Sequence, residues 1–492
     1  MMRMSALPPG PAAAPAASAR ELVTALAGDR FTELPHRPTA DHRAADGDGP
    51  VGWPGYGAAR ASASRRTGES EAVVPGIGRV GGTEAVLIAF EFGFLGGSIG
   101  RAAGERIAGA LITARELGLP VVSLLASGGS RIQEGMFALA QLQGIATQLV
   151  RLRAAGLPHL AVLVGPVTGG GWVTLGAGAD VRLALPGTQV GFAGARVRPA
   201  DADPAAYTAE AQAALGRVDA LVAPADLGAV VARWLSLLTT PAAGPASPPT
   251  ALRAAEPPES GWAAVESARH PDRPRAEAYL GAHFTERVEL GCPDPGLLCG
   301  FGRHEGRTVG YVAQRGTATT PAGFRAATRL FRLADRLAIP VLTLVDTPGA
   351  ANGAEAERDG VGAAIAESIM AVAAATIPVT SLIIGEGGSG GAVALTAPGR
   401  TWVTPDSYYS VVAPESALGL LRRGPELLRA TADELRLRPG DLVELGVARG
   451  IVPVRQPPAG DEAAAGDQVA EDQPPVDQPP VDVSPASRAS RR

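Results

Sequence analysis

The chain alternates short apolar runs with longer stretches in which apolar residues recur at helical spacing. Residues 84–92 are apolar at most positions and predict a strand. Residues 101–117 place alanine, isoleucine and leucine at helical spacing and predict a helix. Gly96 and Gly97 lie between these segments and predict a turn. This order of strand, glycine turn and helix indicates an α/β fold.

A unit of strand, loop, helix and strand occurs twice. The first copy contains, in order, Pro120, a strand over 121–125, a helix from about 133 to 153, Pro158 and a strand over 160–164. The second contains Pro340, a strand over 341–345, a helix from about 360 to 375, and Pro378 before the next strand. The spacing between the two prolines is identical in both copies, since 158 − 120 equals 378 − 340. This regularity predicts duplication of one domain fold, with right-handed crossovers in each copy.

The segments outside the two copies have low-complexity composition. The segment 1–70 is rich in alanine, proline and glycine, and the segment 456–492 contains the repeated pentapeptide Asp-Gln-Pro-Pro-Val at 472–476 and 477–481. Such segments favour solvated chain over a packed core. We therefore expect a disordered tail over 1–70, a first domain over 71–238, a linker over 239–274, a second domain over 275–455 and a second disordered tail over 456–492.

Composition excludes several classes of protein. The 492 residues include no lysine, so all 44 basic residues are arginines. A phosphate-binding P-loop, a Schiff-base enzyme and a chain that itself carries biotin or lipoate all require a lysine. Only Cys292 and Cys299 are cysteines, which excludes a four-cysteine zinc site and does not suggest a disulfide framework.

Charge and hydropathy predict the compartment and the broad classes of partner. The net charge of −5 gives no basic face for nucleic acid, and the apolar runs are too short to span a membrane. The proline-interrupted N-terminal region lacks the continuous apolar stretch of a signal peptide. We expect a cytoplasmic protein that binds neither nucleic acid nor membrane.

Glycine-rich loops follow the predicted strands of both copies. In the first copy they are 126–131 and 168–171, and in the second they are 346–350 and 385–392. A strand that ends in glycines and enters a helix exposes backbone N–H groups near the positive end of the helix dipole. Such a loop can bind an anion or stabilise a developing oxyanion. The alternative is that the glycines only permit tight turns and close helix packing.

Three other motifs suggest different chemistry. Residues 387–391 fit the G-x-S-x-G nucleophile elbow, but no histidine stands in a loop after a late strand to act as base. Residues 346–349 fit the D-x-x-G turn of nucleotide switches, but the lysine-bearing P-loop is missing. Glu355, Glu357 and Asp359 could ligate a metal, but a solvated loop and the acidic start of a helix explain them better. No metal site is predicted.

At these loops the sequence resembles a known family. The first half, through the segments 94–100, 127–134 and 191–194, resembles the β subunit of bacterial acetyl-CoA carboxylase carboxyltransferase. The second half, through 346–350, 384–392 and 409–415, resembles the α subunit. The resemblance covers most of 75–240 and 283–453, as if both subunits were fused in one chain.

The resemblance implies two crotonase-like domains of repeated β-β-α units, with acyl-CoA bound mainly by the first and carboxybiotin by the second. It implies transfer of the carboxyl group from carboxybiotin to acetyl-CoA, giving malonyl-CoA for fatty acid or polyketide synthesis. Gly169 and Gly170 would hold the thioester enolate oxygen, and Gly390 and Gly391 the biotin ureido oxygen. The released biotin anion would take the α-proton, so that no protein base is required. The other candidate substrate-binding residues are Gly96, Gly97, Gly128, Gly129, Arg131, Gly349, Gly388 and Ser389.

The resemblance also implies partners. Because the chain has no lysine, biotin must arrive on a separate biotin carboxyl carrier protein, loaded by a biotin carboxylase. The active site would form between domains of two copies, in a homodimer or a higher oligomer.

The sequence departs from the family pattern in several places. The segment 1–70 lacks the four-cysteine zinc ribbon that usually begins the β subunit, and Trp172 stands where a small residue is usual. The segment after Gly194 is shortened, and Ser416 and Ala417 replace an expected Gly-Cys pair. Another acyl-CoA substrate such as propionyl-CoA, a relation to malonyl-decarboxylating enzymes, and a non-catalytic assembly partner remain as alternatives.

Overall fold

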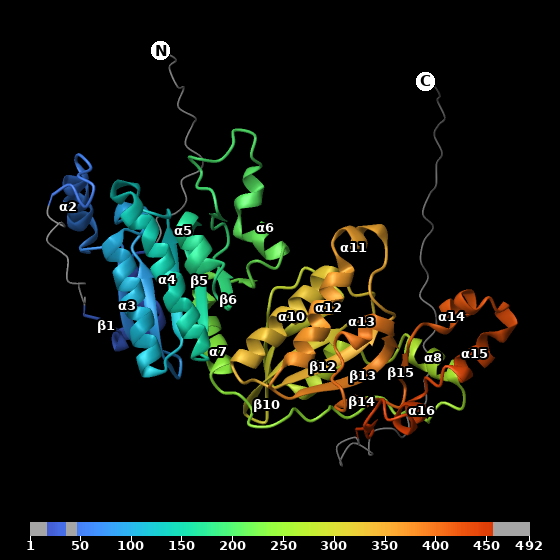
Figure 1. Ribbon diagram of the computed structural model, residues 1–492. Helices are drawn as coiled ribbons and strands as arrows, with labels where there is room; N and C mark the ends of the chain where they lie inside the picture. The colour runs from blue at the N-terminus through green and yellow to red at the C-terminus, as the bar shows by residue number, and fades with distance from the viewer. Residues whose placement is uncertain (1–16, 36–46, 456–492) are drawn as a thin grey trace, which may run out of the picture. The chain divides into compact units, whose positions relative to one another are not determined.

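The structure, a computed structural model, describes residues 17–35 and 47–455. The described residues up to Val454 belong to one compact unit that contains two eight-stranded sheets. Figure 1 shows the helices of each half along its own sheet. No helix within the described ranges is long and apolar enough to cross a membrane.

The first sheet has the strand order β1-β2-β3-β4-β5-β6-β8, and β7 pairs with β5 beyond the register of β6. The strands are β1 (Thr32–Glu33), β2 (Val73–Val80), β3 (Thr83–Phe90), β4 (Val121–Ser127), β5 (His159–Thr168), β6 (Val181–Ala184), β7 (Val190–Gly191) and β8 (Ala220–Leu221). β1, β2 and β3 pair antiparallel, and the remaining pairs are parallel. The helices are α1 (Ala19–Ala27), α2 (Tyr56–Thr67), α3 (Arg101–Leu117), α4 (Met136–Ala154), α5 (Gly169–Gly171), α6 (Ala209–Ala214) and α7 (Leu227–Leu238).

The second sheet repeats this plan in the order β16-β14-β13-β12-β11-β10-β9, and β15 pairs with β13. Its strands are β9 (Glu286–Glu289), β10 (Leu297–His304), β11 (Arg307–Gln314), β12 (Val341–Thr347), β13 (Val379–Gly388), β14 (Thr401–Val403), β15 (Tyr408–Ser410) and β16 (Gly450–Ile451). Its helices are α8 (Gly261–Arg269), α9 (Ala276–His283), α10 (Pro321–Arg336), α11 (Ala354–Arg358), α12 (Val361–Ala374), α13 (Ser389–Val393), α14 (Pro414–Leu421), α15 (Leu428–Glu434) and α16 (Pro439–Glu444).

The predicted duplication is confirmed strand by strand. β4 and β12 have identical lengths, as do β5 and β13, and both pairs are separated by the same interval along the chain. Even the register irregularity recurs, between Leu125 and Ser127 in one half and between Val345 and Thr347 in the other. Helices α3 and α4 pack together on the first sheet as α10 and α12 do on the second (Figure 1). The α/β class and the two repeated domains expected from the sequence are therefore present.

The burial of the central strands explains why the repeat can be recognised in the sequence. Every residue of β4 and of β12 is buried. Parallel strands that are covered on both faces require continuous apolar runs, since no side faces water. These runs position the glycine loops, because each loop starts where a buried strand ends.

The expectation of a disordered tail over 1–70 is wrong for the part that the structure describes. Ser18 caps α1 in a capping box with Glu21, and α1 buries five apolar residues, Ala19, Leu22, Val23, Leu26 and Ala27. β1 then adds an antiparallel edge strand to β2, and α2 inserts the buried Tyr56 beneath a glycine loop. Residues 1–16 and 36–46, and the expected C-terminal tail over 456–492, lie outside the described residues.

The expectation of a linker over 239–274 is also wrong, because this segment packs against the second domain. Ala242 donates its N–H to Thr308 O (3.0 Å) and Ala251 donates to Pro453 O (2.9 Å). Helix α8 buries its apolar face against Tyr408 and Leu437. The many prolines of this segment suggested a flexible linker. Each proline removes only one backbone hydrogen-bond donor, so the segment can still pack against the domain.

The two halves are joined by a buried carboxylate. Asp219 accepts hydrogen bonds from Arg329 (2.6 and 2.9 Å) and from the Gly291 N–H (2.9 Å), all across the halves. The same carboxylate accepts from the Arg182 N–H within the first half (2.7 Å). Although burial opposes its charge, these donors lower the pKa of Asp219, so it stays an anion that fixes the junction.

Candidate active site

The two loops of each half meet at the carboxyl end of the central parallel strands. In the first half, a Cβ added at Gly129 would lie 3.3 Å from the Gly169 Cα. In the second half, a Cβ at Gly391 would lie 2.5 Å from the Gly349 carbonyl carbon. Only glycine allows these two backbones to approach so closely. The structure thus brings the two glycine loops of each half into contact.

The short helices α5 and α13, which follow the second loop of each half, each begin with one residue in the left-handed region. Gly169 has φ +54° and its repeat equivalent Ser389 has φ +49°. For a non-glycine residue this conformation costs about 1–2 kcal/mol, so the surrounding structure holds Ser389 in place. The sharp turn directs the next N–H groups, those of Gly170 and Gly390, out of the first helical turn, where they have no intrahelical acceptor.

The backbone donors differ from the expected set in one respect. The Gly169 N–H donates to Phe192 O (2.9 Å), so this group is already engaged. Gly169 contributes its left-handed conformation, and Gly170 is the candidate donor of the first half. In the second half, a Cβ at Gly390 would meet nothing within 4 Å, so the space beside the candidate donor is open.

Four other glycines of the first half stabilise the loop over residues 126–131 through backbone contacts. The Gly128 N–H donates to Gly96 O (2.8 Å), and the Gly129 N–H reaches Ser127 Oγ (3.2 Å). Gly97 has φ +62°, and a side chain there would collide with the Ala126 carbonyl. These contacts give Gly96, Gly97 and Gly128 a structural role, whereas the sequence analysis predicts that they bind substrate.

Arg131 does not face a substrate. It is 1 % exposed, and its guanidinium bonds Glu71, Glu134 (3.3 Å), the Tyr56 hydroxyl (3.1 Å) and Ser98 O (2.7 Å). A buried cation needs such partners because its desolvation is costly. The prediction that Arg131 binds substrate is therefore corrected. This buried side chain stabilises the glycine loop over residues 126–131 from inside the domain.

An equivalent anchor supports the second half. Arg273, within the segment expected to be a linker, is 3 % exposed and bonds Asp346 Oδ1 (2.5 Å) and Ile384 O (3.3 Å). Asp346 Oδ1 also accepts from the Glu386 N–H (3.2 Å). Thr347 Oγ1 accepts from the Gly349 N–H (3.1 Å) as Ser127 does for Gly129. A buried ion pair thus ties the start of one glycine loop to the start of the other.

Sequence reasoning missed a charged cluster beside the second loop. Arg269 of α8 reaches Glu386 Oε2 (2.7 Å) and Glu415 Oε1 (2.5 Å), and the Tyr408 hydroxyl donates to Glu386 (2.9 Å). Burial, together with the charge of Glu386, raises the pKa of Tyr408, so its hydroxyl remains a donor. The two glutamates stand inside the recognised motifs, but their arginine lies far away in sequence, in a segment without periodicity.

The competing motifs gain no support from the described part of the chain. No hydrogen bond joins Ser389 to a histidine among the described residues, and His283 and His304 stack on each other elsewhere, with ring centroids 3.8 Å apart. No group of three or more metal-ligating side chains occurs within residues 17–35 and 47–455.

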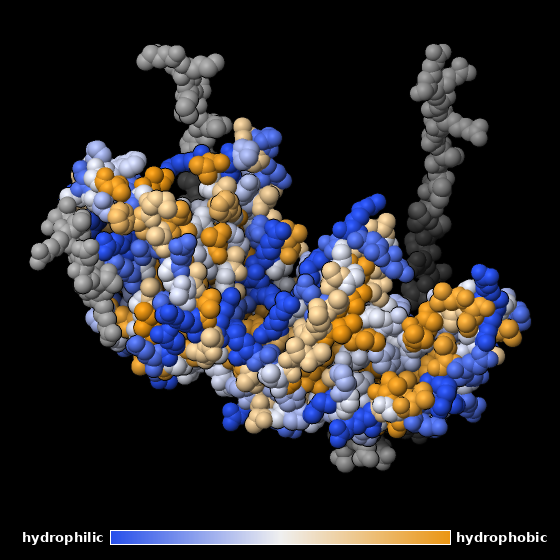
Figure 2. Space-filling model, viewed as in Figure 1, coloured by the Kyte–Doolittle hydropathy of each residue, from blue (hydrophilic) through white to orange (hydrophobic). Residues whose placement is uncertain are grey.

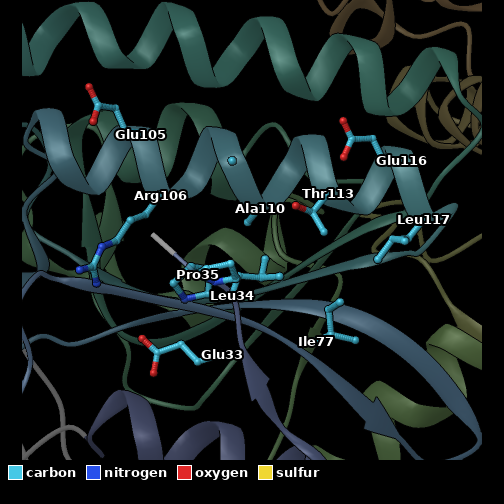
Figure 3. A pocket seen from close by; sticks show the side chains of 12 residues that line it. Glu33, Leu34, Pro35, Ile77, Glu105, Arg106, Ala110, Thr113, Glu116 and Leu117 are labelled. Atoms are coloured by element: carbon cyan, nitrogen blue, oxygen red, sulfur yellow. The ribbon is translucent and has the colours of Figure 1, made fainter. Parts of the chain in front are cut away.

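A cavity of about 340 Å³ lies away from the glycine loops. It is formed between α3 and the β1–β2 edge, with Leu34, Ile77 and Leu117 on its walls and Glu105 near one end (Figure 3). None of its lining residues belongs to a glycine loop. The candidate active site therefore rests on the loops and not on this cavity.

Comparison with solved structures places the fold. The transcarboxylase 12S core with hydrolysed methylmalonyl-coenzyme A bound superposes with a TM-score of 0.73 at 21 % identity, over 89 % of this chain and 86 % of that one. A single-chain, multi-domain long-chain acyl-CoA carboxylase superposes with a TM-score of 0.68 at 20 % identity, over 89 % of this chain and 44 % of that one. The fold is that of the crotonase-like carboxyltransferases.

Sequence comparison gives the family. Residues 259–471 match the family model described as acetyl co-enzyme A carboxylase carboxyltransferase-like. The acetyl-coenzyme A carboxylase carboxyl transferase subunits beta/alpha of Saccharopolyspora erythraea is 37 % identical, over 83 % of this chain and 74 % of that protein. Its counterpart in Salinispora arenicola is 36 % identical, over 89 % and 82 %. The chain belongs to the acetyl-CoA carboxylase carboxyltransferase β/α family, which confirms the enzyme class that the motifs imply.

Proposed function

We propose that this chain moves the carboxyl group of carboxybiotin to the α-carbon of acetyl-CoA, giving malonyl-CoA. The first half binds the CoA thioester, and the second half receives the biotin. Two oxygens gain negative charge in this reaction, the thioester oxygen and the biotin ureido oxygen. Two glycine-loop sites, one in each half, match that requirement.

Each of the two oxygens has its own backbone N–H donors in this proposal. The Gly170 N–H donates to the thioester oxygen as the enolate forms, and the Gly390 and Gly391 N–H groups donate to the ureido oxygen. The carboxybiotin substrate supplies the carboxyl group and, once released, a ureido anion that can take the α-proton. Preorganised backbone donors of this kind contribute about 10²–10³ in rate each.

The surroundings of the two donors support a site without a protein base. Val173 and Val393 stand one turn beyond Gly170 and Gly390, and they are 44 % and 43 % exposed. Residues three apart on a helix share a face. The exposed side chain one turn beyond each donor is therefore aliphatic and cannot accept or donate a proton.

The single observation that carries the assignment is the open space at Gly390. Gly388 and Gly391 are packed against the backbone of the neighbouring loop, whereas a Cβ at Gly390 meets no atom within 4 Å. Among the glycines of this loop, Gly390 is therefore the one whose place close packing does not explain. A ligand that approaches the backbone at the start of α13 accounts for a glycine there.

Several exposed apolar side chains support an assembly of two copies. Ile132, Met136 and Phe137 are 74 %, 71 % and 47 % exposed near the first loop, and Met370 of α12 is 59 % exposed near the second. Figure 2 shows apolar surface over α12 and over the α14–α15 region. We propose that a second copy covers these faces and that a separate biotin carboxyl carrier protein, loaded by a biotin carboxylase, delivers the biotin. We place the activity in the cytoplasm, as the sequence predicts.

The reverse reaction tests the proposal with the purified chain alone. Incubation with malonyl-CoA and free biotin should release acetyl-CoA, at a rate that depends on the biotin concentration. The absence of release from any short carboxylated acyl-CoA would contradict the proposal and favour a non-catalytic assembly role.

A further inference from the structure

The only two cysteines of the chain line one cavity at the junction of the two halves. The cavity has a volume of about 280 Å³, and its walls include Cys292 and Cys299 together with Asp219 and Gly291. Both cysteines are free thiols, Cys292 half-buried and Cys299 only 1 % exposed. The proposed carboxyl transfer uses neither of them.

The register of β9 and β10 places the two side chains on one face of the sheet. Gly300 pairs with Glu289. The next residue, Leu290, donates its N–H to the Cys299 carbonyl (2.9 Å) and so stands opposite that cysteine. Cys292 follows Leu290 by two residues, which returns its side chain to the same face. Diagonal neighbours on one face of an antiparallel pair can reach each other.

The two thiols are hydrogen-bonded and chemically unequal. The hydrogen bond with the Cys299 thiol lowers the pKa of Cys292, although burial opposes its charge. The same bond, together with complete burial, raises the pKa of Cys299. As a neutral thiol, Cys292 also donates to Asp294 O (3.6 Å). Because the thiolate is the reactive form of cysteine, Cys292 is the attacking group and Cys299 is the second thiol held beside it.

This arrangement suits exchange with a small disulfide such as oxidised glutathione. The Cys292 thiol gives its proton to water, and its sulfur attacks one sulfur of the small disulfide, forming a mixed disulfide and releasing one small thiolate. That thiolate takes the Cys299 proton, and the Cys299 sulfur then attacks Cys292 Sγ and releases the second small thiolate, which water reprotonates. The two protein thiols lose two electrons in total, and the small disulfide is reduced to two thiols.

The turn over 290–296, which carries Cys292, holds two other parts of the molecule. The Gly291 N–H donates to Asp219 of the first half (2.9 Å). Asp294 Oδ2 accepts from both the N–H and the hydroxyl of Thr320 at the start of α10 (2.8 Å each). A disulfide places its sulfurs about 2.05 Å apart, closer than two hydrogen-bonded thiols, so the turn has to move when the bond forms.

The start of α10 also contacts a glycine loop of the second half. Thr319 directly precedes the N-cap of this helix. Its N–H donates to Gly349 O (3.2 Å), and its carbonyl accepts from the Ala351 N–H (2.9 Å). A movement of Asp294 is therefore transmitted to the loop over 346–350 through residues in direct contact.

We propose that Cys292 and Cys299 are a reversible disulfide site, oxidised by small disulfides, whose closure loosens the start of α10 and the glycine loop over 346–350. Disulfides in cytoplasmic proteins are usually transient and redox-sensing. A half-buried attacking thiol beside a buried second thiol fits that role. The expectation that oxidation slows carboxyl transfer rests on the proposed function, because the second half is the proposed biotin site.

Intact-mass spectrometry of the native full chain tests the disulfide. Oxidised glutathione should remove two hydrogens from a single chain together with both titratable thiols, and dithiothreitol should restore them. Cys299→Ser should instead retain one glutathione at Cys292, whereas Cys292→Ser should stay unmodified because Cys299 is buried. Two titratable thiols left after oxidation of the native chain, or glutathione on Cys299 in Cys292→Ser, would overturn the inference.

Hydrogen–deuterium exchange tests the consequence without relying on turnover. Loss of a helix N-cap corresponds to about a fivefold change in an equilibrium constant, so exchange in peptides covering 319–323 and 349–351 should accelerate about fivefold on oxidation. Cys292→Ser, treated identically, should show no acceleration. Biotin-dependent release of acetyl-CoA from malonyl-CoA should slow in parallel.

Unchanged exchange, or an unchanged release rate, in the fully oxidised chain would overturn the inference. A reduced chain that releases no acetyl-CoA would contradict the proposed function instead. The thiol count and the exchange rates would then still decide whether the disulfide forms and loosens α10.

Discussion

Replacing Gly390 with valine should abolish carboxyl transfer and leave the fold intact. Gly390 has no left-handed φ, and a Cβ there meets no atom within 4 Å. Valine is a better helix residue than glycine by a few tenths of a kcal/mol, so the change does not cost stability. Its branched side chain would occupy the open space through which the ureido oxygen reaches the Gly390 N–H.

The expected loss follows from the donor that becomes unreachable. Removal of one oxyanion donor usually lowers kcat by about 10²–10³, which is about 2.7–4 kcal/mol of transition-state stabilisation. Because valine also displaces the oxygen from the neighbouring Gly391 N–H, the loss should reach the upper end of this range or exceed it. The KM for malonyl-CoA should change little, because that substrate belongs to the other half.

The assay is acetyl-CoA release from malonyl-CoA and free biotin, run beside a thermal unfolding curve. Gly440→Val serves as the matched control, since Gly440 also has open space around its Cβ position and lies in α16, outside the sequence of both loops. Gly390→Val with full activity and a normal melting temperature would remove the second loop from the mechanism.

Three further predictions concern the framework of the site. Gly391→Ala should destabilise the fold by about 1–3 kcal/mol in urea titration, because its Cβ would lie 2.5 Å from the backbone of Gly349 and Ala350; a normal unfolding midpoint would refute this close packing. Arg131→Met should cost about 3–5 kcal/mol by leaving Glu71 unpaired and buried, whereas Arg315→Met at a surface pair should cost less than about 1 kcal/mol; equal losses would contradict the anchoring role. Burial lowers the pKa of His159 to about 4, below its unfolded value of 6.5, so stability should be fully present above pH 6.5 and fall by up to about 3 kcal/mol towards pH 4; His159→Gln should flatten this pH dependence, and an unaltered slope would exclude His159 as its source.

The sequence predicted the centre of each domain well because burial there leaves few choices. Strands covered on both faces must be continuously apolar, and the loops after them must be glycine-rich where two backbones touch. Both signals are local, so the constant offset between the two copies could be read without a structure. The helix expected from about residue 133 starts at Met136, because Gly135 has φ +52° and ends a preceding 3₁₀ turn.

The missed features depend on contacts between distant residues. Helix α1 carries an apolar stripe at 19, 22, 23, 26 and 27 that could have been found, but the surrounding alanines and prolines masked it. The burial of Arg131 could not be inferred, since its partner Glu71 is 60 residues away. The same is true of Arg273 with Asp346, 73 residues apart. An arginine in a motif does not reveal whether it faces a ligand or an internal carboxylate.

The most direct test of the central claim follows the carboxyl group itself. The purified chain is incubated with malonyl-CoA labelled with ¹³C in its free carboxyl group and with biotin, and the products are examined by mass spectrometry after rapid mixing. The two-loop account predicts labelled carboxybiotin and acetyl-CoA in equal amounts, and neither product with Gly390→Val. Formation of acetyl-CoA without labelled carboxybiotin, at a rate independent of biotin, would contradict it.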